Sequence, residues 1–466
     1  MTERIDDALS VRDGHLFLEG HDAVELADRF GTPIYVLSED QLRRNARRIA
    51  SAFSSRWPEG EVRVLPSIKA NLSLAARAVL TSEGLGCDTF GPSELEAALR
   101  TGVEPARISV NGTAKSEALI ERAVAVGAKV TLDSVREIDL VREVARRLGR
   151  RATVRLRLRP DYVELERASE FVDEEISIRH FASSYKPGIP TPDLLDAGPA
   201  ALSADELDVT GVMAHLGRHH HDPEVWRGMV RGVCATLAEL SKAWNGWTPR
   251  EIDLGGGFPS PRDPTGRALR RGAERPERVE PIETFADVVT TTLRDELAVA
   301  GIDARGIAFE VEPGRAMYAD AGIMLARVVN VKREPGRTPQ RWIETDTTEM
   351  FLADLMIEHD VFPILPASRM DAPDRDAVDV VGISCGFDVL GWSVSLPPET
   401  GPGDVLAFLD TGAYQDATSS NFNAMPRPAT VLVWQDSAEI VKRAETIDDV
   451  FHRDVIPSRL RSGEAP

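Results

Sequence analysis

The feature that most constrains the fold is a regular alternation of short apolar strand patterns and helix patterns between about residues 38 and 315. Such alternation predicts βα units whose strands lie parallel in one sheet. About eight units in roughly 275 residues fit a closed (β/α)8 barrel of the TIM type better than an open sheet. The predicted helices lie at 40–53, 73–80, 92–101, 116–126, 135–148 and 223–244, and the predicted strands at 62–65, 107–111, 129–133, 153–158, 207–214, 251–254 and 306–312.

The residues on either side of this region have a different pattern. Runs typical of β-strands, separated by Gly and Pro, follow residue 315 at 323–329, 378–383, 404–408 and 430–434, and short strand patterns lie at 14–20 and 32–36. We therefore expect an N-terminal segment, 1–37, whose strands join a β domain, then the barrel at 38–315, and then a mostly antiparallel β domain at 316–466. Segments near 160–200 and 259–280 are expected to be loop-like insertions.

Size and charge narrow the class of protein. The chain has 466 residues, more than one hydrophobic core usually holds, which favours two domains. Its 75 acidic and 55 basic residues give a net charge of -20, which argues against binding to nucleic acids or anionic membranes. Three cysteines cannot build a disulfide framework, and neither a long apolar run nor a signal-like N-terminus is present. We therefore expect a cytoplasmic enzyme.

Lys69 is the first candidate for chemistry. It follows the strand pattern Val62–Leu65 and opens a loop, which is where a barrel of this type displays reactive groups. A buried lysine loses its proton more easily than an exposed one, and its amine can then attack a carbonyl carbon to form a Schiff base. An isolated lysine at a strand end is usually only a surface residue, so the assignment depends on the motifs that follow.

Two of these motifs are suited to binding an anion. Gly255–Gly257 follow one predicted strand, and Gly314 and Arg315 follow the last one. Consecutive glycines leave the backbone N–H groups open to a phosphate, and an arginine adds charge-assisted hydrogen bonds. Taken alone, each motif is also compatible with an ordinary turn.

Two other residues are suited to an aromatic ring with a basic nitrogen. His215 follows the strand pattern 207–214 and offers a flat ring for stacking, although a lone histidine is often only a core residue. Glu312 could keep a heterocyclic nitrogen protonated, which turns the ring into an electron sink. Lysine, phosphate site, stacking ring and carboxylate together predict a pocket for pyridoxal 5'-phosphate (PLP).

The chain resembles the fold-type III PLP-dependent decarboxylases, the diaminopimelate and ornithine decarboxylase group, over nearly its whole length. Members carry Lys-Ala-Asn, His-x-Gly, Gly-Gly-Gly-Phe, Glu-Pro-Gly-Arg, a Cys segment and Gly-Ala-Tyr in this order, as this chain does from Lys69 to Tyr414. The resemblance implies an alanine racemase-like α/β barrel with a C-terminal β domain, and the α-decarboxylation of an amino acid.

The same resemblance assigns roles to single residues. It implies that Lys69 forms the Schiff base, that His215 stacks on the cofactor and that Glu312 pairs with the pyridine nitrogen. It also implies an obligate homodimer with shared active sites, in which Cys385 and Tyr414 complete the partner's pocket and Cys385 protonates the quinonoid carbon. The phosphate would be held by Gly255, Gly256, Gly257, Gly314, Arg315 and Tyr414.

The chain departs from the family at the Cys segment. Diaminopimelate decarboxylases follow this Cys with a Glu that contacts the substrate, whereas Gly386 and Phe387 follow Cys385 here. The loop is one residue shorter than usual, and Asp388 is the candidate for the missing acid. Adjacent histidines at 219–221 do not predict a metal site, because neighbouring side chains point in different directions.

A second departure concerns the far end of the substrate. The diaminopimelate branch places an Arg and a Tyr where this chain has Asp354 and Glu358. Reversing the charge disfavours a distal carboxylate and favours a cation, so we expect ornithine, lysine, arginine or a derivative rather than meso-diaminopimelate. The alternative is that both acids lie on a solvated surface.

Two other functions remain open. PLP stabilises carbanions whichever bond breaks, so a racemase, dehydratase or lyase on the same scaffold is compatible with the motifs. A non-catalytic PLP-binding protein is disfavoured, because the chain keeps Cys385 as well as Lys69 and binding alone needs no proton donor.

Overall fold

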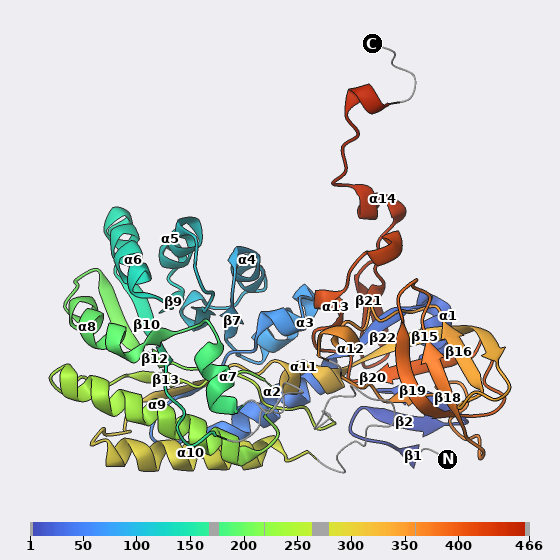
Figure 1. Ribbon diagram of the computed structural model, residues 1–466, viewed down its shortest axis with the longest axis horizontal. Coiled ribbons are helices and arrows are strands. Elements are labelled where there is room, and N and C mark those ends of the chain that lie inside the picture. Colours follow the sequence, from blue (N-terminus) through green and yellow to red (C-terminus); the bar gives the residue numbers. More distant parts are fainter. Residues whose placement is uncertain (1–2, 167–176, 219, 263–278, 359, 462–466) are drawn as a thin grey trace. The chain divides into compact units, whose positions relative to one another are not determined.

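The computed structural model describes residues 3–166, 177–218, 220–262, 279–358 and 360–461 (Figure 1). The chain divides into two compact units. The barrel unit consists of Ser38–Gly322 and Gly412–Ala417. The β unit consists of Met1–Leu37, Ile323–Thr411 and Thr418–Pro466.

A ring of parallel strands forms the centre of the barrel unit. Strands that follow one another in the sequence are also neighbours in the sheet. The ring closes between its first and second strands, where the N–H groups of Gly86 and Asp88 donate to the carbonyls of Val64 and Pro66 at 3.0 and 3.3 Å. The predicted TIM-type barrel is therefore confirmed. In the described chain its strands are β6 (Val62–Val64), β7 (Cys87–Thr89), β8 (Ile108–Val110), β9 (Lys129–Leu132), β10 (Ala152–Arg159), β12 (Leu207–Met213), β13 (Glu251–Asp253) and β14 (Ala308–Val311).

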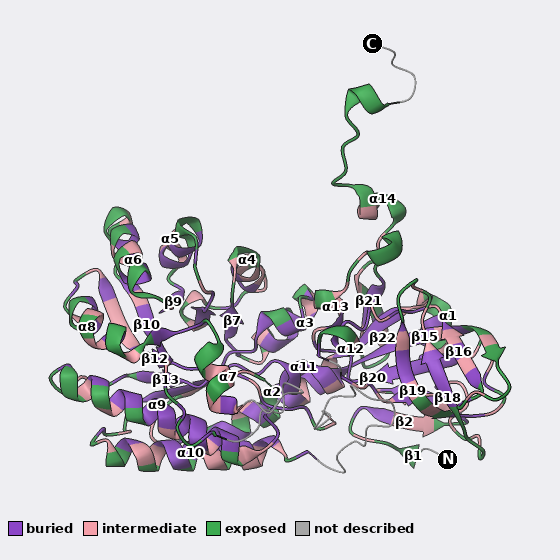
Figure 2. Ribbon diagram, in the orientation of Figure 1, coloured by how far each residue is buried: buried purple, intermediate pink, exposed green. Residues whose placement is uncertain are grey.

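Amphipathic helices connect these strands, and their buried residues form one face of each helix (Figure 2). The helices are α2 (Glu39–Ser54), α3 (Leu74–Ser82), α4 (Pro92–Arg100), α5 (Glu117–Val126), α6 (Val135–Leu148), α8 (Thr191–Leu202), α9 (Pro223–Ala243) and α10 (Ile282–Val299). Side-chain hydroxyls of Ser38, Ser73 and Ser116 accept backbone hydrogen bonds at the first turns of α2, α3 and α5. Left-handed Gly127 and Gly149 end α5 and α6.

The prediction of a loop-like insertion near 160–200 is wrong for much of that segment. It contains helix α7 (Ile178–Ser184), the short strand β11 (Ile189–Pro190) and α8, which connects β10 to β12. Pro192 lies in the first turn of α8, where a backbone N–H would have no acceptor within the helix, so a proline is tolerated there. Pro199 lies inside the same helix. Residues 167–176, and residues 263–278 of the second expected insertion, lie outside the described residues.

The β unit contains two sheets. A small antiparallel sheet runs β1 (Glu3–Arg4), β2 (Leu9–Arg12), β3 (His15–Leu18) and β4 (His21–Asp22), followed by α1 (Ala23–Phe30). In the larger sheet, β5 (Ile34–Ser38) lies between β15 (Gly322–Arg333) and β21 (Ala429–Trp434), so the N-terminal segment is part of this sheet. Its other strands are β16 (Arg341–Thr345), β17 (Ile364–Leu365), β18 (Asp376–Val381), β19 (Val389–Leu396), β20 (Val405–Leu409) and β22 (Ser437–Lys442).

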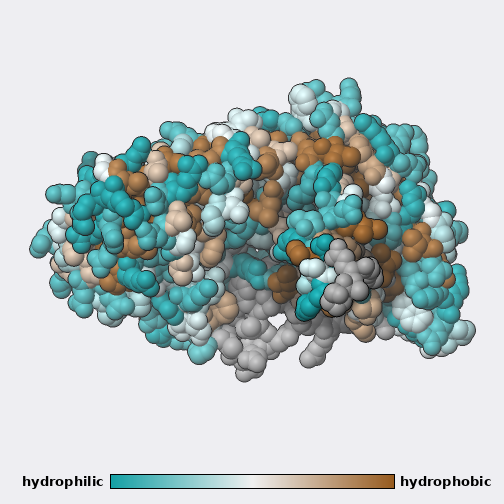
Figure 3. Space-filling model, turned by 90° about the horizontal axis from the view of Figure 1, so that it is seen from above, coloured by the Kyte–Doolittle hydropathy of each residue, from teal (hydrophilic) through white to brown (hydrophobic). Residues whose placement is uncertain are grey.

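Most of this larger sheet is antiparallel, with β16 and β18 as a parallel pair. The mostly antiparallel β domain is therefore confirmed. Two buried apolar clusters pack on its strands, one including Val36 and Val431 and the other Tyr35 and Phe408. Hydrophilic residues cover much of the face shown in Figure 3. Within the described residues, none of the helices has both the length and the apolarity that crossing a bilayer requires.

Candidate active site

Lys69 lies in a short 3-10 turn, Ile68–Ala70, directly after β6. Its two neighbours in the turn are buried, which fixes the backbone, while 49% of the Lys69 side chain is exposed and can be reached by a small molecule. Its amine lies 3.9 Å from the Asp88 carboxylate. Desolvation disfavours the ammonium form, but nearby acidic groups, with Asp88 as the largest contribution, outweigh it and raise the pKa of Lys69. Contrary to the expectation of an easily lost proton, Lys69 is a cation until another group takes that proton.

Asn111 joins the two carboxylates nearest to this amine. Its side-chain amide donates to Asp88 at 2.7 Å and to Glu312 at 2.5 Å. The Ser67 hydroxyl donates a second hydrogen bond to Asp88. Because Ser67, Asp88, Asn111 and Glu312 follow or end four different barrel strands, ring closure is what brings them together. Neither Asp88 nor Asn111 was among the predicted site residues.

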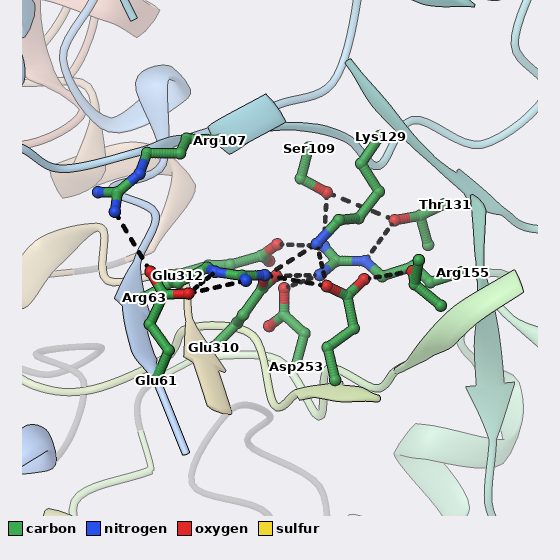
Figure 4. A network of polar contacts seen from close by, with 12 residues as sticks. Glu61, Arg63, Arg107, Ser109, Lys129, Thr131, Arg155, Asp253, Glu310 and Glu312 are labelled. Carbon is green, nitrogen blue, oxygen red and sulfur yellow. Dashed lines mark hydrogen bonds and ion pairs between the residues drawn. The ribbon is translucent and has the colours of Figure 1, made fainter. Parts of the chain in front are cut away.

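Glu312 occupies a strongly acidic and buried position. Burial raises its pKa well above the ordinary value, and the nearby carboxylates of Asp253 and Asp88 add to this effect, while Arg155 opposes it. Arg155 lies 3.2 Å from Glu312 and 2.7 Å from Asp253 (Figure 4). These surroundings therefore favour the protonated form of the Glu312 carboxyl in the free site. A neutral acid can give its proton to a basic ring nitrogen and then remain beside it as a carboxylate.

A ladder of buried charges inside the barrel fixes Arg155 in turn. Arg155 also pairs with Glu310 at 2.5 Å, and Lys129 pairs with Glu310 at 2.9 Å and with Glu251 at 2.6 Å (Figure 4). Arg63 contacts the same two glutamates at 3.0 and 3.1 Å. These side chains come from β6, β9, β10, β13 and β14, so the ladder ties five strands together beneath Glu312.

The three glycines after β13 allow neighbouring strand ends to approach closely. A Cβ on Gly255 would lie 2.6 Å from His215 Nδ1, and one on Gly256 would lie 2.1 Å from the Glu312 carbonyl oxygen. A Cβ on Gly257 would lie 2.2 Å from the carbonyl oxygen of Gly217. Within the described residues, no acceptor takes the N–H groups of Gly256 and Gly257. These two donors are thus free for an anion.

His215 is held beside these glycines as a neutral ring. Burial lowers its pKa well below the ordinary value, and the positive charges of Lys69 and Arg157 lower it further. Its buried Nδ1 has no hydrogen-bond partner within the part of the chain that the structure describes. A neutral imidazole of this kind is suited to contact with the face of an aromatic ligand. Of the other histidines, His220 and His221 are buried, and His219 lies outside the described residues.

Tyr414 belongs to the site of its own barrel. Its N–H donates to the Ala70 carbonyl at 2.6 Å, next to Lys69, and the Arg315 guanidinium lies 5.1 Å from the centre of its ring. A Cβ on Gly314 would lie 2.6 Å from the Tyr414 hydroxyl. The prediction that Tyr414 completes a partner's pocket is therefore wrong. The structure groups Gly314, Arg315 and Tyr414, as the predicted phosphate contacts require.

The remaining predicted residues belong to the β unit. Cys385 is exposed, and the Asn423 side-chain amide donates to its Sγ at 3.2 Å. Asp354 and Glu358, on and after the short helix α12 (Asp354–Ile357), are 3% and 0% exposed, so the solvated-surface alternative is wrong. Asp388 is buried and accepts three hydrogen bonds from the protein, so its contacts do not support a role toward substrate.

The barrel residues fit a phosphorylated pyridine aldehyde. An accessible amine, a buried carboxyl group with a raised pKa, a neutral imidazole and two free backbone N–H groups lie at the ends of neighbouring strands. These are the groups needed for an aldehyde carbon, a ring nitrogen, a ring face and a phosphate, respectively.

Comparisons with known proteins agree with this chemistry. The pyridoxal binding domain of the pyridoxal-dependent decarboxylases matches residues 39–319. The diaminopimelate decarboxylase of Actinosynnema pretiosum is 31% identical, over 95% of this chain and 93% of its own. That of Methanothermobacter thermautotrophicus is 30% identical, over 96% of this chain and 97% of its own.

A solved structure extends the similarity to the whole fold. The crystal structure of diaminopimelate decarboxylase from Methanocaldococcus jannaschii in complex with L-lysine has a TM-score of 0.85 and 27% sequence identity. The match covers 98% of this chain and 99% of that one.

Proposed function

Because the chain belongs to the pyridoxal-dependent decarboxylase family, we propose that it decarboxylates an amino acid with a basic or extended side chain. Family membership confirms the predicted cofactor, PLP, and the predicted reaction class, amino-acid decarboxylation. The observation that carries the substrate class is the burial of Asp354 and Glu358, at positions where the diaminopimelate branch has an arginine and a tyrosine. Two buried acids favour a cationic group on the substrate, such as that of ornithine, lysine, arginine or a derivative.

Bound PLP withdraws electrons from the substrate's Cα, so that the bond to its carboxyl group can break. The barrel residues would hold this cofactor. The Lys69 amine would carry its aldehyde carbon covalently, and Gly256, Gly257 and Arg315 would bind its phosphate. His215 would lie against its ring, and Glu312 would keep its ring nitrogen protonated.

Cys385 is the proposed proton donor of the reaction. Its exposed thiol, oriented by Asn423, would deliver a proton to the substrate's Cα after carbon dioxide has left. We propose that the active enzyme is a homodimer in which this thiol serves the partner's barrel site.

Meso-diaminopimelate is the second candidate substrate. It is favoured because relatives that align over 95–98% of this chain are diaminopimelate decarboxylases. The substituted positions 354, 358 and 386 argue against it.

A substrate panel distinguishes the two candidates. The PLP-loaded enzyme would be incubated with L- and D-ornithine, lysine, arginine and meso-diaminopimelate, with carbon dioxide release measured and products identified by mass spectrometry. We expect release from a basic amino acid and little from meso-diaminopimelate. Efficient turnover of meso-diaminopimelate would contradict the proposed substrate class. Racemisation or elimination without carbon dioxide release would contradict decarboxylation itself.

A further inference from the structure

We propose that Glu349 supplies the acidic substrate contact that the Cys385 loop lacks, and that it binds the ammonium group of the substrate's side chain. This inference rests on the decarboxylase function proposed above. The substrate's α-amino group is engaged by the cofactor during such a reaction, so the side-chain ammonium is the one left for the protein to recognise.

The backbone first brings two segments of the β unit together. The loop 382–388 connects β18 to β19, and residues 346–349 follow β16, which pairs with β18. The Ile383 N–H donates to the Thr347 carbonyl at 3.1 Å. One oxygen of Asp388 accepts from the Glu349 N–H at 2.7 Å, and the other accepts from the Ser384 N–H at 2.5 Å. Asp388 thereby fastens the Cys385 loop to the segment that carries Glu349.

The Glu349 carboxylate then lies against the residue that follows the cysteine. Its Oε1 accepts a hydrogen bond from the Asp388 N–H at 3.2 Å. A Cβ on Gly386 would lie 2.9 Å from the same oxygen, closer than such atoms approach in proteins. The acid of residue 349 thus fills the space where a side chain at position 386 would begin. The position after Cys385 and the Glu349 carboxylate are therefore adjacent in space.

This carboxylate has no cation of its own. Within the described residues, no lysine or arginine pairs with Glu349, and no donor reaches its Oε2. Asp354 and Glu358, by contrast, each have further contacts within the chain. Partial burial raises the pKa of Glu349, and the charge of Asp388 adds to this. An ammonium group beside Glu349 would stabilise its ionised form and so oppose both the burial and the charge of Asp388.

The thiol lies on the same loop. The Cys385 N–H donates to Asn423 Oδ1 at 3.0 Å, so the loop is held on that side as well. Glu349 and Cys385 are therefore presented by one rigid assembly, with Asp388 as its positioning residue.

The test compares Glu349→Gln with Glu344→Gln, a matched change on β16 at an exposed pair with Lys332. Kinetics would use the amino acid that gives the highest carbon dioxide release in the wild-type protein. We expect Glu349→Gln to lower kcat/KM by about 10- to 100-fold, mainly through KM, because a hydrogen bond to a charged group is lost. Glu349→Asp should restore part of this loss, and Glu344→Gln should change it less than about twofold.

Inhibition separates ammonium recognition from a structural role. L-lysine and L-norleucine have side chains of similar length, but only lysine ends in an ammonium group. In Glu349→Gln, inhibition by L-lysine should weaken by at least about tenfold while inhibition by L-norleucine stays within about threefold. Equal weakening of both, or unchanged kinetics, would overturn the assignment while leaving the decarboxylase function intact. A wild-type protein that releases no carbon dioxide from any candidate would instead overturn the proposed function, and this inference with it.

Discussion

At the scale of single residues, the surroundings of Lys69 favour a charged side chain, whereas those of Glu312 and His215 favour neutral ones. Asp88 favours the protonated form of the Lys69 amine, whereas burial favours the neutral forms of Glu312 and His215. A protonated amine does not attack a carbonyl, so attachment of the cofactor requires a proton to leave Lys69. Asp88, 3.9 Å from this amine, stabilises its protonated form, so another group must accept the proton.

The first prediction concerns this attachment. Borohydride reduction of the PLP-loaded protein, followed by peptide mass spectrometry, should find the pyridoxyl group on Lys69. Lys69→Ala should lose the visible absorbance of the bound cofactor, because no other amine replaces it. Labelling of another lysine would contradict the assignment of the whole site.

The second prediction concerns Glu312. Glu312→Gln should retain PLP, since Lys69 and the glycine loop are unchanged, but lose the proton that the acid gives to the ring nitrogen. We expect kcat to fall by roughly 100- to 1,000-fold, corresponding to about 3–4 kcal/mol. Cofactor absorbance and carbon dioxide release measured on the same sample check this, and near-normal turnover would refute the role.

Motifs made some of these residues predictable. Lys69, His215 and Glu312 each follow a recognisable strand within a short motif, so their convergence at one end of the barrel could be foreseen. Asp88 and Arg155 carry no such motif, because their contacts depend on ring closure and on side chains that point into the barrel. Their role emerges only when distant strands are placed side by side.

At the scale of elements, patterning predicted most barrel strands and helices to within a few residues. Strand β7 was missed because it is only three residues long and contains Asp88, a polar residue inside the barrel. Helix α8 was missed because proline and glycine within it are typical of loops. Helix α10 was missed as well, and its Val and Thr residues lower helix propensity. In these elements tertiary contacts override local preference.

The third prediction concerns the charge ladder between strands. Positive charges of Arg155 and Lys129 overcome the burial of Glu310 and lower its pKa to about 2. In an unfolded chain the pKa of a glutamate is about 4.3, so ionised Glu310 stabilises the barrel above that pH. This stabilisation is lost as the pH falls from about 4.3 towards 2.

Glu310→Gln should remove the same contribution at neutral pH. It leaves buried Lys129 and Arg155 with one carboxylate fewer, which should lower the free energy of unfolding by about 3–5 kcal/mol. Urea denaturation at pH 7 and pH 3 measures this, with Asp303→Asn, at an exposed pair with Arg305, as the control that changes little. An unchanged unfolding midpoint for Glu310→Gln would show that the ladder is not stabilising.

At the scale of the whole molecule, the length of the chain predicts two domains, and the chain divides into two compact units. The location of the segment Gly412–Ala417 could not be predicted from its position in the sequence. Residues Gly412–Ala417 leave the β unit and pack on the barrel unit, because the Asn71 side chain donates to the Gly412 carbonyl at 2.8 Å and Tyr414 binds Ala70. A motif late in the sequence therefore belongs to the barrel's own site.

In the proposed mechanism, catalysis joins Lys69 of one subunit with Cys385 of another. Lys69→Ala and Cys385→Ala proteins, each inactive alone, would be mixed, with subunit exchange verified by native mass spectrometry. Random exchange makes half of the dimers mixed, each with one intact site, so activity should recover to about a quarter of the wild-type value. No recovery in the presence of mixed dimers would show that each site is built within one chain. Near-wild-type activity of Cys385→Ala alone would contradict the role of the thiol.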